Sequence, residues 1–314
     1  QTALAAVGST MRGIFPLYWI GLAGTGNWLY LLLAALLIVA LMAAIIAVMS
    51  RSFIKMTTAG TAAKKKVYVA AKTKKSSVFA ALLRKEFRRL TASAGYMLNC
   101  ALGTLLLPAL GIFALVKADS LQAVVTELSI SPDMLALLLC AAMCMAASMN
   151  DLTAPSISLE GKNLWLLQSL PVSAWQVLKA KLSLHMLVTE IPVLFCAACL
   201  SVAAKLPIVS TLLLLLLSSL FVLLEAAFGL SVNLKSPNLT WTNENVPIKQ
   251  SSSVFFALFG GWLFVIALAA LYFAVHSFLS ATAYLLLCGG IVALLTALLL
   301  WWLKKKGSKI FAAL

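Results

Sequence analysis

Two acidic residues inside long apolar stretches are the strongest candidates for chemistry in this sequence. Glu190 and Glu225 each lie roughly 10–12 Å from the inner end of a predicted membrane span, at about 1.5 Å per helical residue. An ionised carboxylate is costly in hydrocarbon, so each carboxyl must face a cavity, meet a partner or be protonated. In one interpretation both are neutral and bonded to nearby hydroxyls, those of Thr189, Ser218 or Ser219. In the other they line a translocation path that favours cationic or amphipathic cargo.

The common motifs for hydrolysis of nucleotides, peptides or esters are absent from the sequence. No G-x-x-x-x-G-K-[ST] run occurs, since Gly161-Lys162 is followed by Asn163 and lacks the glycine-rich approach. H-E-x-x-H and G-x-S-x-G are missing as well. His185 and His276 fall on different predicted spans near opposite faces, which argues against a histidine-paired metal site. We expect no catalytic residue, metal or bound cofactor in this chain.

Helices that cross a membrane must position these residues. Hydrophobic residues make up 63% of the 314 and charged residues 11%, against roughly 25% charged in soluble domains. Apolar runs of about 20 residues recur, and each is long enough to cross a hydrocarbon core of roughly 30 Å. The sequence predicts an all-α membrane protein with about seven transmembrane helices: 27–49, 94–116, 133–150, 182–203, 209–232, 254–276 and 282–303.

The basic residues predict the orientation of these spans. With the C-terminus in the cytoplasm, 21 of the 24 Lys and Arg residues fall in cytoplasmic segments, which are 51–89, 151–181, 233–249 and 304–309. Only Arg12, Lys117 and Lys205 lie elsewhere. The positive-inside rule strongly favours this topology over its inverse. The net charge of +15 then reports topology and contact with anionic lipid headgroups, and it requires no nucleic acid.

The pattern divides the chain into five parts. They are an extracytoplasmic segment (1–26), a first transmembrane helix (27–50), a basic cytoplasmic linker (51–77), a membrane domain introduced by an amphipathic helix (78–303) and a cytoplasmic tail (304–314). Because the chain begins at Gln1, we expect that upstream sequence is missing.

The stretch "VFAALLRKEFRRL" at 78–90 predicts an amphipathic helix lying in the headgroup region. Its apolar face holds Phe79, Leu82, Leu83, Phe87 and Leu90, and its basic face holds Arg84, Lys85, Arg88 and Arg89. Glu86 falls in the middle of the apolar face. It either pairs with Arg89 one turn on or contacts another cytoplasmic element, and the sequence leaves both readings open.

The stretch "SLEGKNLWLLQSLPVSAWQVLKAKL" at 158–182 is too polar to cross a bilayer and too apolar for a flexible linker. Residues 163–169 predict a helix of one to two turns, which Pro171 ends. Ser173 and Gln176 form a capping-box pattern, so a second helix begins near Ala174 and runs unbroken to about 203. This geometry predicts a rigid knob that projects into the cytoplasm.

Side chains of the knob are candidates for contact with a partner. We expect Trp165 and Leu166 as central anchors with Glu160 and Lys162 at the rim, because interfaces centre on buried aromatics. Trp175 lies near the knob's surface too, and anchoring at the membrane interface explains it at least as well.

A second inner segment, 233–253, carries two prolines, Pro237 and Pro247, between which no helix is expected. Pro247 suits the first position of the next helix. The polar side chains here cap helix ends or touch a partner. The candidates for such contact are Trp241, Asn243, Glu244 and Lys249.

Three ordered stretches now carry a resemblance: "LLRKEFRRL", "APSISLEGKNLWLLQSLPVS" and "VNLKSPNLTWTNENVPIKQSSSV". Together they resemble the permease subunits of bacterial ATP-binding-cassette (ABC) exporters of the second permease type, over about residues 78–303. The resemblance implies an elbow helix (78–90) with Arg84, Glu86, Arg88 and Arg89. It also implies six membrane helices forming one exporter half, and a coupling helix in the first cytoplasmic loop.

The resemblance also implies partners and a location. The span at 27–49 would be the last helix of a preceding half, within a permease of roughly twelve helices. ATP and Mg²⁺ would bind a separate cytoplasmic ABC ATPase, and the chain would lie in the bacterial plasma membrane. The alternatives are an ion-coupled secondary transporter using Glu190 or Glu225, and an intramembrane enzyme, which the missing motifs disfavour.

Overall fold

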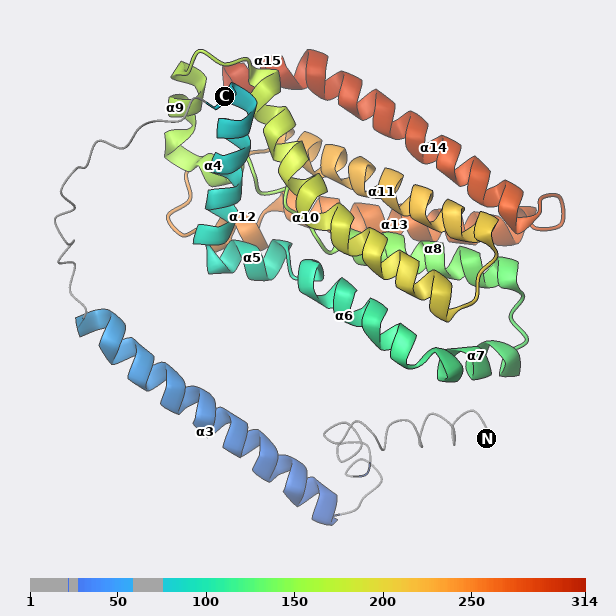
Figure 1. Ribbon diagram of the computed structural model, residues 1–314. Helices are drawn as coiled ribbons and strands as arrows, with labels where there is room; N and C mark the ends of the chain where they lie inside the picture. Colours follow the sequence, from blue (N-terminus) through green and yellow to red (C-terminus); the bar gives the residue numbers. More distant parts are fainter. Residues whose placement is uncertain (1–21, 23–27, 59–75) are drawn as a thin grey trace. The chain divides into compact units, whose positions relative to one another are not determined.

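The computed structural model describes residue 22 and residues 28–58 and 76–314, and every regular element among them is a helix (Figure 1). The chain divides into two compact units, Gln1–Thr73 and Lys74–Leu314. The extracytoplasmic segment predicted over 1–26 and most of the basic linker predicted over 51–77 lie outside the described residues. The first unit contains α3 (Trp28–Thr58), so the helix predicted over 27–50 continues into the region assigned to the linker.

The second unit is a bundle of helices with short helical pieces at one end. Its elements are α4 (Val78–Ala92), α5 (Ala94–Cys100), α6 (Gly103–Val116), α7 (Ala118–Glu127), α8 (Pro132–Ser148), η1 (Ser158–Asn163), α9 (Leu164–Ser169), α10 (Ala174–Ala203), α11 (Ile208–Lys235), α12 (Asn245–Lys249), α13 (Ser252–Val275), α14 (Ala281–Trp302), the π-helical turn η2 (Leu303–Gly307) and α15 (Ser308–Ala313).

Five helical segments in the described residues are long and apolar enough to cross a membrane, namely α3, α10, α11, the α12–α13 segment and the α14–α15 segment. The predicted span at 94–116 is instead a pair, α5 and α6, bent by 44°. The span predicted at 133–150 is the shorter α8, of 17 residues. The prediction of an all-α membrane protein is confirmed.

The break between α5 and α6 has a visible cause. The Gly103 N–H, at the start of α6, donates to Oδ1 of Asn150 at 2.9 Å. A Cβ at Gly103 would lie 2.5 Å from that oxygen, so only glycine allows the approach. The side chain of Asn150, just after α8, thus accepts a hydrogen bond from an N–H that would bond to a backbone carbonyl if the predicted span were one continuous helix.

Helix α11 lies at the centre of the unit and packs against α8, α10, α13 and α14. Apolar side chains from these helices form the main core, which includes Met143, Val193, Phe221 and Val292. A second cluster lies at the end of the bundle that carries α4, α9 and α15 (Figure 1), and it contains Leu82, Leu178, Leu234 and Phe311.

The predicted knob has the expected backbone. Helix α9 is a single short helix, and α10 runs for 30 residues from Ala174. Ser173 and Gln176 form the reciprocal capping box. The expectation for Pro247 was wrong, because Pro247 lies inside the five-residue α12 and the next long helix begins at Ser252 behind the Ser251 cap.

These ends of the bundle give a labelling test of the topology. The six native cysteines are buried, so background reaction with a thiol reagent should be low. Ser169→Cys, at an exposed position of α9, should stay protected from a membrane-impermeant maleimide in intact cells, and Thr126→Cys in α7 should react. The reverse pattern would show that the inverse topology is the correct one.

Candidate functional site

The chain between α8 and α9 is buried although it is polar. Every residue from 150 to 161 is buried, including the side chains of Asn150, Asp151, Thr153, Ser156, Ser158 and Glu160. The sequence predicted this stretch as cytoplasmic loop, with Glu160 at the rim of an exposed knob. The structure corrects that placement, because the loop folds back among the helices and the exposed surface begins only at Lys162.

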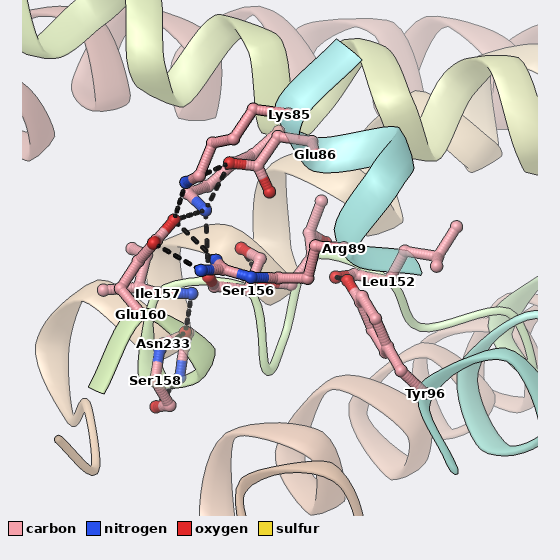
Figure 2. A network of polar contacts seen from close by, with 12 residues as sticks. Lys85, Glu86, Arg89, Tyr96, Leu152, Ser156, Ile157, Ser158, Glu160 and Asn233 are labelled. Atoms are coloured by element: carbon pink, nitrogen blue, oxygen red, sulfur yellow. Dashed lines mark hydrogen bonds and ion pairs between the residues drawn. The ribbon is translucent and has the colours of Figure 1, made fainter. Parts of the chain in front are cut away.

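One carboxylate in this loop pairs with three cations, two from α4 and one from α10. Glu160 accepts hydrogen bonds from Lys85 at 2.5 Å and from Lys181 at 2.7 Å through Oε1. Arg89 faces both of its oxygens at 2.7 Å, with Nη2 donating to Oε2. Figure 2 shows the cations of α4 pointing toward Glu160 from across the loop.

Lys181 lies at the centre of this cluster, with no exposed side-chain surface. Its ammonium donates to Glu86 at 3.0 Å, to Glu160 at 2.7 Å and to the Ser156 carbonyl at 2.9 Å. All three ammonium hydrogens therefore have acceptors, which a buried lysine requires. We call Lys85, Glu86, Arg89, Glu160 and Lys181 the ion cluster.

Electrostatics keep the Glu160 carboxylate ionised. Burial alone would raise the pKa of the Glu160 carboxyl, but Lys181, Arg89 and Lys85 outweigh burial and hold that pKa well below its ordinary value. Burial and repulsion by Lys181 lower the pKa of Lys85, although Glu86 and Glu160 oppose them. Glu160 is thus the group on which the charges converge.

The structure decides between the two readings of Glu86. It is buried on α4 and pairs with Lys181 of α10 and with its neighbour Lys85. It therefore contacts another element, as the second reading proposed. The expected orientation of α4 is partly wrong, because Lys85 and Arg89 point into the protein while Arg84 and Arg88 are exposed.

Asn233, near the end of α11, holds the backbone of the same loop. Its Oδ1 accepts from the N–H groups of Ile157 at 2.8 Å and Ser158 at 3.1 Å (Figure 2). Its Nδ2 donates to the hydroxyls of Ser158 at 2.8 Å and Ser253 at 3.2 Å. One buried amide thus makes four hydrogen bonds and joins the loop to α11 and α13.

Trp241 binds the loop from the other side. Its indole N–H donates to the Ser158 carbonyl at 2.5 Å, and its ring lies 3.2 Å from where a Cβ on Gly161 would be. Gly161 has φ of 55° and ψ of −140°, a conformation that favours glycine. Gly161 therefore turns the chain out of the buried loop and into α9.

Helix α9 presents the anchors expected from the sequence. Leu164 and Leu167 are buried, whereas Trp165 is 63% exposed and Leu166 54% exposed. Lys162 is exposed beside them. Trp175 is half-buried against the second core cluster, so it contributes less to the free surface.

The remaining residues of the second inner segment bond within the chain. Asn243 accepts from the Asn245 N–H at 2.9 Å, and Glu244 accepts from the Ser93 hydroxyl at 2.9 Å, next to α4. Lys249 is exposed at the end of α12. Asn243 thus binds the first N–H of α12 from one residue before the N-cap, which is Glu244.

The two intramembrane acids lie in different surroundings. Glu190 of α10 accepts a hydrogen bond from the Ser219 hydroxyl of α11, a partner that the sequence suggested. Glu225 of α11 is buried with one carboxyl oxygen against Gly261 of α13 and beside the Ser148 hydroxyl. The structure does not bring Glu190 and Glu225 together with the ion cluster into one site.

Sequence reasoning missed Lys181, Asn233 and Asp151 as parts of the site. Each lies within a few residues of the end of an apolar span, where polar side chains are common and do not by themselves indicate a site. The available signal was the spacing of Lys181, His185 and Thr189, which puts three polar side chains on one face of the predicted helix. In the structure all three are buried.

The ion cluster predicts a large effect of one isosteric change. Glu160→Gln leaves Lys181, Arg89 and Lys85 without their shared carboxylate, and breaking a buried ion pair from one side costs about 3–5 kcal/mol. We expect a clear fall in thermal unfolding temperature in detergent. Glu244→Gln, at an exposed carboxylate, is the matched control and should be near neutral; equal stability of the two variants would contradict the assignment.

Asp151 predicts a pH dependence of stability. Burial raises the pKa of its carboxyl to about 8 against the weak hydrogen bond from the Ala154 N–H. The folded protein therefore keeps a proton that the unfolded chain loses above about pH 4, so the free energy of unfolding falls as the pH rises toward 8.

Asp151→Asn removes this titration without changing shape. Its unfolding temperature should vary less between about pH 5 and pH 8 than that of the wild type, and should exceed it at pH 8. Asp119→Asn, at an exposed position of α7, should keep the wild-type profile. An unchanged profile in Asp151→Asn would show that another group carries the effect.

Comparison with known proteins places these features in a family. A search of curated protein sequences finds no match to this chain. The family model described as a membrane protein of 12 TMs matches residues 2–303, which is most of the chain. It agrees with the all-helical fold and its several apolar spans. The chain is an integral multi-pass membrane protein and belongs to this family of membrane proteins with twelve transmembrane helices.

Proposed function

We propose that the chain is a permease subunit of an ABC exporter, with its C-terminus in the cytoplasm of a bacterial cell. In this proposal α5–α6, α8, α10, α11, α13 and α14 form one six-helix half, and α3 is the last helix of the preceding half. Helix α4 is the elbow helix. Membership of a family described by twelve transmembrane helices supports a permease built from two such halves.

The observation that carries the proposal is the exposed apolar face of α9 on a rigid base. Trp165 and Leu166 are large, apolar and more than half exposed, although they lie at the end of the bundle that holds most cations. Exposed aromatic side chains of this kind serve as anchors in protein interfaces. We propose that they dock on a cytoplasmic ABC ATPase, which binds the ATP and Mg²⁺.

A groove beside α9 supports the same assignment. It has an empty volume of about 1140 Å³ and lies between α4 and α9. Its lining combines apolar side chains, among them Leu82, Leu166 and Leu170, with three charged residues of the ion cluster, Lys85, Arg89 and Glu160. A partner that binds α9 would thus meet both apolar and charged side chains.

The ion cluster connects α9 to the helices of the membrane domain. Glu160 lies four residues before Leu164, the first residue of α9, and it is bound to α4 and α10. Helix α10 continues from the knob for 30 residues, roughly 45 Å. A displacement of α9 therefore moves α4 and α10 with it, because its base is tied to both.

Trp165→Ala tests the docking. Truncating a central aromatic side chain typically costs about 2 kcal/mol or more, at least roughly tenfold in affinity. We expect the variant to lose co-purification with its ATPase and ATP-dependent transport while keeping the wild-type unfolding temperature. Phe278→Ala removes an aromatic that is 86% exposed at the opposite end of the bundle, and it should leave both activities intact. Full ATPase binding by Trp165→Ala would exclude α9 as the docking surface.

The second candidate is an ion-coupled secondary transporter, favoured by the buried Glu225 in the middle of α11. This alternative requires transport that continues without any ATPase and stops in Glu225→Gln. The exporter requires transport that stops when ATP is withdrawn. Transport by the purified protein in vesicles, with and without ATP and the partner, distinguishes the two.

A further inference from the structure

Glu225 opens onto a groove that the coupling mechanism does not use. The groove has an empty volume of about 710 Å³ and lies between α11, α13 and α14. Its lining consists of leucines, glycines, Phe228, Phe264 and Glu225, so Glu225 contributes the one ionisable group to an otherwise apolar wall.

The carboxyl is placed there by glycine. A Cβ on Gly261 would lie 2.0 Å from Oε1 of Glu225 and 2.7 Å from the Ser148 hydroxyl, so any other residue would displace the carboxyl. Gly260, beside it, lies against the ring of Phe228, where a Cβ would come within 2.9 Å. The two glycines thus let α13 approach α11 and leave space in front of the acid.

Glu225 has no cationic partner of its own. Every ion pair recorded in the described part of the chain lies within the ion cluster, and Glu225 belongs to none of them. It is 6% exposed and about 15 Å along α11 from Lys235, at 1.5 Å per residue. An ionised acid at this depth is costly unless it faces a cavity or meets a partner, and Glu225 has the Ser148 hydroxyl on one side and the groove on the other.

Aromatic rings complete the site. Phe228 and Phe264 both line the groove, and Phe264 is stacked on Phe221 with ring centroids 6.5 Å apart. Aromatic faces attract cations, most strongly where water is excluded. Leucines supply the rest of the wall, which suits hydrocarbon and not a hydrated ion.

We propose that this groove binds a lipophilic cation, with its charge at Glu225 and its apolar groups against Phe228, Phe264 and the leucines. Opposite charge, aromatic faces and apolar walls at one place are the chemistry that recognises such a molecule. The inference rests on the proposed transport function, since it names the class of cargo. The binding itself, however, needs neither the ATPase nor transport.

The test is binding of radiolabelled tetraphenylphosphonium, a permanent lipophilic cation, to the purified protein in lipid nanodiscs. Glu225→Gln has the same shape and should weaken binding by at least about tenfold, because it removes the one carboxylate facing the cation. Phe228→Leu keeps the wall apolar and should weaken it a few-fold. Uncharged triphenylphosphine oxide should bind all of these proteins equally.

Two further variants locate the effect. Glu127→Gln removes an exposed carboxylate at the far end of α7 and should bind like the wild type. Trp165→Ala should also bind like the wild type, so failure of the coupling proposal and failure of this one give different results. Unchanged binding in Glu225→Gln, or a loss found in Glu190→Gln instead, would overturn the assignment.

Discussion

The convergence of three cations on the buried carboxylate of Glu160 is the interaction on which the end of the bundle that carries α4, α9 and α15 depends. A lysine with no exposed side-chain surface is stable only where acceptors surround it, and Lys181 finds them in Glu86, Glu160 and the Ser156 carbonyl. Because these groups come from α4, the loop and α10, none of the three elements can shift alone without leaving a buried charge unpaired. These ion pairs therefore fix the positions of α4, the loop and α10 relative to one another more tightly than apolar packing alone.

The polar loop from 150 to 161 is buried, and hydrogen bonds to its backbone replace part of the water it gives up. Asn233 binds two of its N–H groups, Trp241 binds the Ser158 carbonyl, and Tyr96 donates to the Leu152 carbonyl at 2.6 Å. Gly161, with its positive φ, then turns the chain out of the loop, and α9 follows at the surface. The exposed Trp165 consequently stands on a base whose backbone is fixed from several sides.

Much of the fold follows from local sequence, and the site follows from contacts that local sequence does not encode. The capping box at Ser173, the 30-residue α10 and the short α9 were predictable, because caps, prolines and apolar periodicity act over a few residues. The sequence predicted Glu160 at the surface because its partners lie far from it along the chain, Lys85 by 75 residues and Lys181 by 21. Local sequence patterns do not reveal such pairs. The break after α5 depends on Asn150 in the same way, since its cause lies 47 residues away.

Photo-crosslinking from α9 tests most directly the proposal that this helix docks on the ATPase of an ABC exporter. A benzophenone amino acid at position 165 should, on irradiation of native membranes, form a crosslink to a protein that carries a nucleotide-binding motif. The same group in place of Val116, which is 74% exposed at the other end of the bundle, should not. A crosslink to no ATP-binding protein from position 165, or an equal one from position 116, would contradict the account.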